Sequence, residues 1–213
     1  MLIMQNLKVY KSPLVSEQFM SRWWEVVAKG LVCTKPEVYQ AMRPTDHLYH
    51  LPVPSDKIIV FGAIRASPSH VGGLSYSVDL YCDHGTPIFA ASAGTVVRVR
   101  SSKNVHGNTI DMWDEGNFID IRCRHQEDGR EAHTWYEHMP YNGILVREGQ
   151  EVERGQHIAF VGNTGFTENP HLHLQVHVSI GDGPRDIKTL GARFEDFEPV
   201  YEHIGLKPLM RIA

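Results

Sequence analysis

A strict alternation of polar and apolar residues runs through positions 170–178, which read Pro-His-Leu-His-Leu-Gln-Val-His-Val. Leucine or valine occupies every second position, and histidine or glutamine occupies the positions between them. A period of two is typical of a half-buried β-strand, whose successive side chains point to opposite faces. His171 and His173 then share a face about 6.6 Å apart, at ~3.3 Å per residue. Two imidazoles at that separation can serve one small site.

The patterns elsewhere predict a short helical start and a β-rich body. Residues 16–31 carry apolar side chains at helical spacing, with Ser16 placed to cap the start and Gly30 at the end. Residues 34–56 contain four prolines and are expected to form a loop. From residue 57 on, short apolar or alternating runs are separated by glycine-containing turns, as in a β-sandwich or barrel. The predicted strands are 57–62, 75–81, 86–91, 94–101, 117–123, 131–138, 157–162 and 171–179.

The sequence therefore predicts a mainly β fold with an antiparallel sheet or sandwich core. We divide the chain into a helical and loop extension over 1–56, a β-rich domain over 57–180, and a C-terminal tail over 181–213 that packs on the domain. No long helix is predicted between 57 and 180. This argues against a doubly wound α/β fold, in which helices alternate with strands.

Composition narrows the classes of function. Of the 213 residues, 42% are hydrophobic and 22% charged, which is ordinary for a globular protein. The net charge of −4 comes without a long run of one sign, so we expect neither nucleic acid nor an anionic membrane as partner. No apolar stretch approaches the ~18 residues of a membrane span, and the first residues lack the pattern of a secretory signal. Cys33, Cys82 and Cys123 are far apart and odd in number, so buried free thiols are expected.

The 13 histidines are the unusual component, and they indicate metal chemistry. Asp79 lies in a strand pattern, and His70 precedes it across a Gly72-Gly73 turn. Two histidines and a carboxylate are a sound ligand set for catalytic zinc, because three protein ligands leave the fourth position for water. Taken alone, His70 and Asp79 are explained equally well as an exposed loop histidine and a hydrogen-bonding carboxylate.

A further segment, 134–138, reads Thr-Trp-Tyr-Glu-His and ends a predicted strand. Alternation places Tyr136 and His138 on one face. A helical zincin is excluded, because no H-E-x-x-H occurs and the histidine spacing here is one residue too long for H-x-x-E-H. In the loop before His171, Asn163 could orient ligands or substrate, or satisfy backbone groups.

Other histidines receive weaker assignments. Asp46, His47 and His50 are competent metal donors, but the surrounding prolines favour a structured loop. His177 lies about 13 Å from His173 at ~3.3 Å per residue, which is too far for the same metal. We therefore expect His177 to be hydrogen-bonded or solvated.

Taken in order, these segments resemble the lysostaphin-type zinc metalloendopeptidases from about residue 68 to 180. The resemblance covers just over half of the chain, and its segments are specific as a set although each alone is only moderately so. The motifs that carry it are His70 and Asp79, Gly85-Thr-Pro87 with 90–97, Tyr136-Glu-His138, Gly149 to Gly155-Gln, Gly162-Asn-Thr-Gly165, and Pro170-His171-Leu-His173.

The resemblance implies a β-rich fold, one Zn²⁺ per chain, and hydrolysis of peptide bonds in bacterial peptidoglycan stems or cross-bridges by a zinc-activated water. It implies that His70, Asp79 and His173 bind the metal and that His138 and His171 are catalytic. Independently of the resemblance, Tyr136 and Asn163 are candidate contacts to substrate, and Tyr136 is explained equally well as a buried strand tyrosine. Eight residues separate His70 from Asp79, whereas the common family pattern has three. His84 is therefore an alternative third ligand.

Two other functions compete with this prediction. A catalytically inactive protein of the same fold could bind cell wall or activate another enzyme. A biotinyl or lipoyl carrier is also a small β-sandwich, but its hairpin needs a lysine where this chain has Glu153-Arg154. The family implies a peptidoglycan or peptide partner and a cell-envelope or extracellular location, which conflicts with the absent signal pattern. The sequence does not indicate the bond cleaved or the oligomeric state.

Overall fold

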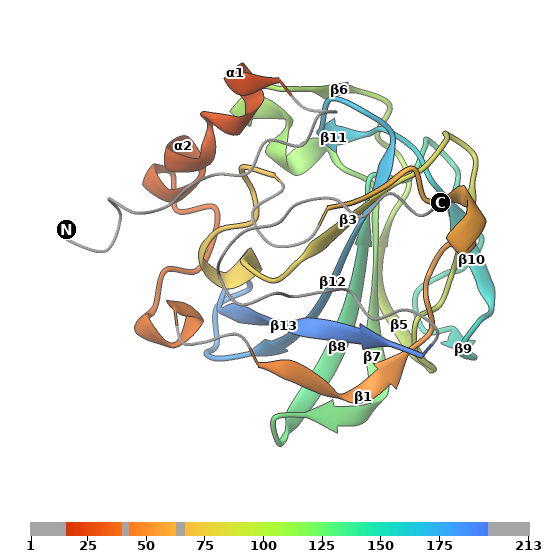
Figure 1. Cartoon of the computed structure of the whole chain (residues 1–213). Helices are drawn as coiled ribbons and strands as arrows, with labels where there is room; N and C mark the ends of the chain where they lie inside the picture. The colour runs from red at the N-terminus through yellow and green to blue at the C-terminus, as the bar shows by residue number, and fades with distance from the viewer. Residues whose placement is uncertain (1–15, 40–42, 63–66, 196–213) are drawn as a thin grey trace.

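Strands dominate the computed structural model, which describes residues 16–39, 43–62 and 67–195 (Figure 1). Two short helices come first, α1 over Glu17–Met20 and α2 over Trp23–Ala28. The strands are β1 Pro44–Tyr49, β2 Val60–Gly62, β3 Val78–Tyr81, β4 Pro87–Phe89, β5 Gly94–Arg100, β6 His106–Gly107, β7 Phe118–Glu127, β8 Arg130–Glu137, β9 Glu151–Val152, β10 His157–Phe160, β11 Gly165–Phe166, β12 His171–Ser179 and β13 Ile187–Phe194. Single 3₁₀ turns occur at Pro36–Tyr39, Ser55–Lys57, Gly72–Leu74 and Ile110–Glu115. The predicted mainly β fold with a short helical start is confirmed.

Strand β12 lies at the centre of the main sheet, whose order is β1-β13-β12-β8-β7-β5-β9. On one side β12 pairs antiparallel with β8. On its other side it pairs antiparallel with β3 over 171–174 and with β13 over 176–179. Strand β2 extends the sheet beyond β3, and the pairs β10–β4 and β11–β6 lie outside it. The alternating stretch of the sequence is therefore the strand with most neighbours.

Both faces of β12 are buried, which corrects the prediction of a half-buried strand. The apolar face enters the main core through Leu172, Leu174 and Val176. On the polar face, His171, His173, Gln175 and His177 are only 4–6% exposed. Residues 31–33 of the N-terminal part and 184–187 lie across this face, where they line the same cavity as β12. A histidine row that looks like a solvated face is thus an interior surface.

The eight predicted strands all occur, with shifted ends, but five strands were not predicted. The expected loop over 34–56 contains β1, which pairs in parallel with β13 from the expected tail. Only Thr45 and Tyr49 of β1 are buried, so no apolar alternation marks it in the sequence. Within the expected tail, residues 187–194 form strand β13 of the sheet. Residues 196–213 lie outside the described residues, as do 1–15 and 40–42 of the extension.

The single helix expected over 16–31 is wrong. Ser16 does cap α1, accepting a hydrogen bond from the Phe19 N–H at 3.1 Å, and Gly30 has the positive φ of a helix end. The hydroxyl of Ser21, however, donates to the Gln18 carbonyl at 2.8 Å, and the chain turns before α2 begins. Such back-bonding by serine competes with the helical ladder. Of the predicted apolar stripe, Trp24 is 57% exposed.

The two helices lie beside β6 and β11, away from the main core (Figure 1). Phe19 of α1 contacts Phe166 of β11, with ring centroids 4.6 Å apart, in a small second cluster with Val26 and Val32. The three cysteines are buried free thiols, as predicted. Within the described ranges, no helix has the length and apolarity needed to cross a membrane.

Candidate functional site

Three donor atoms converge where β3 faces β12. The antiparallel register places Asp79 directly opposite His173. The Oδ1 atom of Asp79 lies 3.0 Å from His173 Nδ1 and 3.1 Å from Nε2 of His70, which comes from the loop before β3. The two imidazole nitrogens are 3.2 Å apart, and all three side chains are buried. The structure thus brings the three sequence-predicted ligands together.

This donor set fits a zinc ion. Two ligands at 2.0–2.1 Å from a tetrahedral zinc lie about 3.4 Å apart, close to the spacing of these three atoms. The second carboxylate oxygen of Asp79 is buried without a hydrogen-bond partner, so the carboxylate retains acceptor capacity for a cation. The alternative donor His84 is exposed on the turn after β3 and belongs to none of the described donor groups. The eight residues between His70 and Asp79 therefore still allow the two side chains to meet.

Neighbouring histidines keep the Asp79 carboxyl group ionised. Burial acts to raise the pKa of this carboxyl, but His70, His171 and His173 around it hold the pKa well below its usual range. Burial likewise acts to lower the pKa of His173, and the contact with Asp79 reverses this effect and raises it. An ionised carboxylate among imidazoles is the electrostatic setting that a divalent cation requires.

His171 and His138 flank the three donors. The Nε2 atom of His171 lies 3.7 Å from Asp79 Oδ1, and the rings of His171 and His138 have centroids 4.5 Å apart. Nδ1–H of His171 donates to the Asn169 carbonyl at 2.8 Å, and Nδ1–H of His138 donates to the Thr164 carbonyl at 2.7 Å. These bonds select one tautomer and leave Nε2 of each ring with a free lone pair.

Burial keeps both flanking rings neutral. It lowers the pKa of His171 to about 3 and the pKa of His138 to about 4. Two neutral imidazoles with free Nε2 atoms, held beside the three donors, can accept protons from a group bound there.

His138 reaches this site through an unusual backbone conformation. Strand β8 ends at Glu137, and His138 has φ of +76°, a value that few residues other than glycine adopt. The predicted alternation, which put His138 on the face of Tyr136, is therefore wrong. Tyr136 is buried in the core, accepting from the Ala91 N–H at 2.8 Å and donating to Thr134 Oγ1 at 3.2 Å. The structure does not bring Tyr136 to the site.

Asn163 also lies outside the cavity lining, behind His171. Its side-chain oxygen accepts from Thr167 Oγ1 at 3.0 Å, and its amide contacts His106 at 3.2 Å. The Thr167 hydroxyl lies 3.3 Å from His171 Nδ1. Asn163 is thus placed to support the loop that holds His171, and not to touch a ligand in the cavity.

Gly162 packs against the backbone that carries His138. A Cβ atom added there would lie 2.4 Å from Pro140 N and 2.6 Å from the His138 carbonyl oxygen, and backbone atoms cannot move aside independently. We expect Gly162→Ala to reduce the free energy of unfolding by about 1–3 kcal/mol through overpacking. Urea denaturation measures this loss. Gly107→Ala is the control, because its Cβ would meet only the Met112 side chain, and an equal loss in both variants would contradict the prediction.

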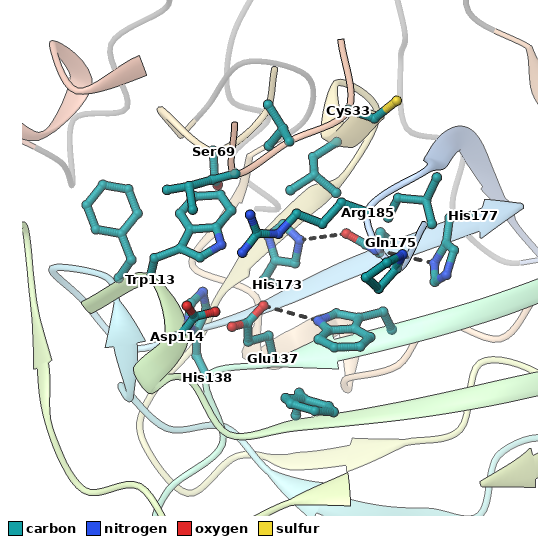
Figure 2. A pocket seen from close by; sticks show the side chains of 18 of the residues that line it. Cys33, Ser69, Trp113, Asp114, Glu137, His138, His173, Gln175, His177 and Arg185 are labelled. Atoms are coloured by element: carbon teal, nitrogen blue, oxygen red, sulfur yellow. Dashed lines mark hydrogen bonds between the residues drawn. The ribbon is translucent and has the colours of Figure 1, made fainter. Parts of the chain in front are cut away.

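A cavity of about 370 Å³ opens beside His138 and His173 (Figure 2). Four aromatic side chains and several charged ones line it: Trp113, Phe118, Trp135, Phe166, Arg98, Arg100, Asp114, Glu137 and Arg185. Glu137 accepts a hydrogen bond from Trp135 Nε1 at 3.1 Å, and burial raises the pKa of its carboxyl. Sequence reasoning missed Glu137 as a site residue, because its position opposite His173 depends on the register of β8 against β12.

A row of hydrogen bonds orients His173 from the side of its ring that faces away from Asp79 (Figure 2). Its Nε2–H donates to Gln175 Oε1 at 3.3 Å, which leaves Nδ1 facing Asp79. The Gln175 amide donates in turn to Nδ1 of His177 at 3.3 Å. His177 is therefore buried and hydrogen-bonded, and it supports the site without belonging to it. Such outer contacts fix the orientation of ligating histidines.

Part of the chain is similar to known peptidases. The sequence profile of Peptidase family M23 matches residues 73–186. Lysostaphin from Staphylococcus staphylolyticus is 34% identical over 105 residues, 49% of this chain and 18% of that protein. Peptidoglycan DD-endopeptidase ShyA from Vibrio cholerae is 35% identical over 94 residues, 44% of this chain and 18% of that protein. A crystal structure of a zinc containing peptidase from Vibrio cholerae aligns with 68% of this chain and 39% of its own, at 26% identity and a TM-score of 0.46. The chain thus matches under a fifth of the length of both curated relatives.

Proposed function

The chain belongs to peptidase family M23, and from this premise we propose that it is a zinc-dependent endopeptidase acting on the peptides of bacterial peptidoglycan. The observation that supports the proposal best is the convergence of His70, Asp79 and His173, with the free Nε2 atoms of His138 and His171 beside them. This arrangement would supply three metal ligands and two proton acceptors beside the cavity that His138 and His173 line.

The three ligands would hold zinc through His70 Nε2, Asp79 Oδ1 and His173 Nδ1. When bound, zinc polarises the scissile carbonyl and lowers the pKa of the attacking water toward about 7. His173 is held in its ligating orientation by Gln175, and Asp79 supplies the negative charge that favours the cation.

His138 and His171 would move the proton. Each ring is neutral and presents Nε2, because its Nδ1–H is bonded to a backbone carbonyl. Either ring can accept the proton of the attacking water at Nε2. The imidazolium formed in this way stabilises the developing oxyanion and then donates its proton to the leaving amine.

The proposed substrate follows from the relatives and from the cavity. ShyA is named a peptidoglycan DD-endopeptidase. The cavity beside His138 offers stacking surfaces and both signs of charge, through groups such as Trp135, Arg100 and Glu137. Such a lining suits a short peptide with charged ends or side chains. We accordingly place the protein's action in the cell envelope or outside the cell.

Digestion of purified peptidoglycan tests this function. We expect the protein to release fragments with new amino termini, because hydrolysis of a peptide bond creates them, and mass spectrometry identifies the bond. A chelator should stop the release, and added zinc should restore it. Release that persists in a metal-free protein would contradict the zinc assignment. Cosedimentation with peptidoglycan without any release would favour the inactive cell-wall-binding alternative.

A further inference from the structure

A second group of metal-competent side chains lies outside the cavity. His47 comes from β1, and His125 and Glu127 come from the end of β7. His47 Nδ1 is 3.3 Å from Glu127 Oε1, and His125 Nε2 is 3.7 Å from the same oxygen. One ligand atom from each residue lies within 4.8 Å of the others. None of the three side chains lines the cavity beside His138.

Within the described residues, no lysine or arginine forms an ion pair with Glu127, although the charge of nearby Arg43, which pairs with Asp46 and Asp128, also acts on it. The Glu127 carboxylate is 0% exposed and accepts from the N–H groups of Asp46 at 2.6 Å and His47 at 3.1 Å, and from the Tyr49 hydroxyl at 3.2 Å. Within residues 16–39, 43–62 and 67–195, its ion-pair partners within 4.0 Å are the imidazoles of His47 and His125. Buried carboxylates are usually paired with a charge or bound to a metal, because burial of an isolated charge is costly.

A third group of metal-competent side chains contains a buried carboxylate whose charge an arginine neutralises. Asp120 lies with His133 and His177 on the polar face of the sheet. Arg98 donates two hydrogen bonds to Asp120 Oδ2, at 3.0 and 2.8 Å, and His133 contacts Oδ1 at 2.8 Å. An arginine already neutralises that carboxylate, so the group is an ion-pair network. The Glu127 group has the same types of donor, but in the described part of the chain no arginine donates a hydrogen bond to its carboxylate.

We propose that His47, His125 and Glu127 form a second zinc site. The Nδ1–Oε1 and Nε2–Oε1 distances of 3.3 and 3.7 Å are close to the separation of about 3.4 Å between two ligands of a tetrahedral zinc. The two rings stack with centroids 3.9 Å apart, and the side chain of His47 is 49% exposed. That exposure lets the His47 ring turn to complete the geometry and lets water take the fourth position.

The surroundings of His125 suit a ligand. The Tyr49 hydroxyl donates to Glu127 and lies 2.8 Å from His125 Nε2. Binding of a metal by Nε2 replaces the second contact and places the ring proton on Nδ1, which faces Ser92 Oγ at 3.5 Å. Imidazole and carboxylate donors are a common zinc set.

The second site would join the N-terminal part of the chain to the sheet. Strand β1 contributes only Thr45 and Tyr49 as buried side chains, and it pairs with β13 at the edge of the sheet. A metal held by His47 and by two residues of β7 adds a link that the unfolded chain lacks. Zinc bound in this way stabilises the folded protein by mass action.

Counting zinc in the full chain tests the second site independently of catalysis. Chelator-stripped protein is equilibrated with buffered micromolar zinc, and bound metal is measured by plasma mass spectrometry. We expect wild type to bind one zinc ion more per chain than His47→Ala or His125→Gln. His84→Ala is the control, because His84 is exposed and outside each donor group, and it should bind as much zinc as wild type.

A second measurement uses a variant that lacks the zinc site of His70, Asp79 and His173. In His173→Ala, added zinc should raise the melting temperature, and this rise should vanish in His173→Ala combined with His47→Ala. Peptidoglycan hydrolysis by His47→Ala should match wild type, which separates this inference from the proposed function. Equal zinc in wild type, His47→Ala and His125→Gln would overturn the second site. The contact of Glu127 with His47 would then be a hydrogen bond without a metal.

Discussion

Replacing His173 with alanine is expected to remove zinc from the site with His70 and Asp79 and to reduce peptidoglycan hydrolysis to background. His173 Nδ1 lies within 3.2 Å of both other donors, so its loss leaves two ligands and a buried, under-compensated carboxylate. Loss of a contact that merely orients a ligand costs about 10–100-fold in metal affinity, and loss of the ligand itself should cost more. Atomic absorption and fragment release measure the two effects.

The His173→Ala result is interpreted with a second substitution in the background and with a control variant. Zinc is counted in a His47→Ala background, so that the proposed second site contributes none. Asp79→Ala should lose zinc in the same way, whereas His84→Ala should keep it, because the structure places His70 and not His84 beside Asp79. Normal zinc and activity in His173→Ala would refute the site assignment. Loss of zinc in His84→Ala would instead indicate that His84, the alternative third ligand, binds the metal.

The donors on strands could be predicted because their positions follow from local alternation. A period of two places His171 and His173 on one face whatever the rest of the fold does. Their meeting with Asp79 depends on the register of β3 against β12, between segments about 90 residues apart. Spacing alone left His70 and His84 as alternatives, and the path of the chain through Gly72–Leu74 decided between them.

The side-chain direction of His138 could not be predicted from local sequence patterns. Alternation assigned it to the face of Tyr136, but its φ of +76° turns it out of the strand pattern. Glycine often signals such a conformation in a sequence, and histidine does not. For Tyr136 the sequence allowed either a contact to substrate or a buried strand position, and its side chain lies in the core.

Local sequence patterns also could not predict that the polar face of β12 is buried. Residues 31–33 and 184–187 reach β12 only through tertiary packing, and β1 and β13 form through pairing across the whole domain. This covering has a chemical consequence, because burial lowers the pKa values of His138 and His171 and keeps both rings neutral. The parts of the chain that sequence reasoning treated as extension and tail therefore help to set the chemistry of the site.

His138→Ala and His171→Ala are expected to retain zinc and to lose about 10²–10⁴-fold in the rate of hydrolysis, the usual contribution of general acid–base catalysis. The reason is geometric, because neither ring belongs to the group of three converging donors, yet both present a free Nε2 beside it. Zinc content and the rate of fragment release are measured for the same preparations.

Asn163→Ala is the matched control for His171, since Asn163 contacts the same loop through Thr167 but lies outside the cavity lining. It should lose far less activity than His171→Ala. If either histidine variant loses zinc together with activity, that residue acts as a ligand. If both variants keep zinc and near-normal activity, the proton must be accepted elsewhere, and Glu137, the carboxylate beside His138 in the same cavity, becomes the group to test.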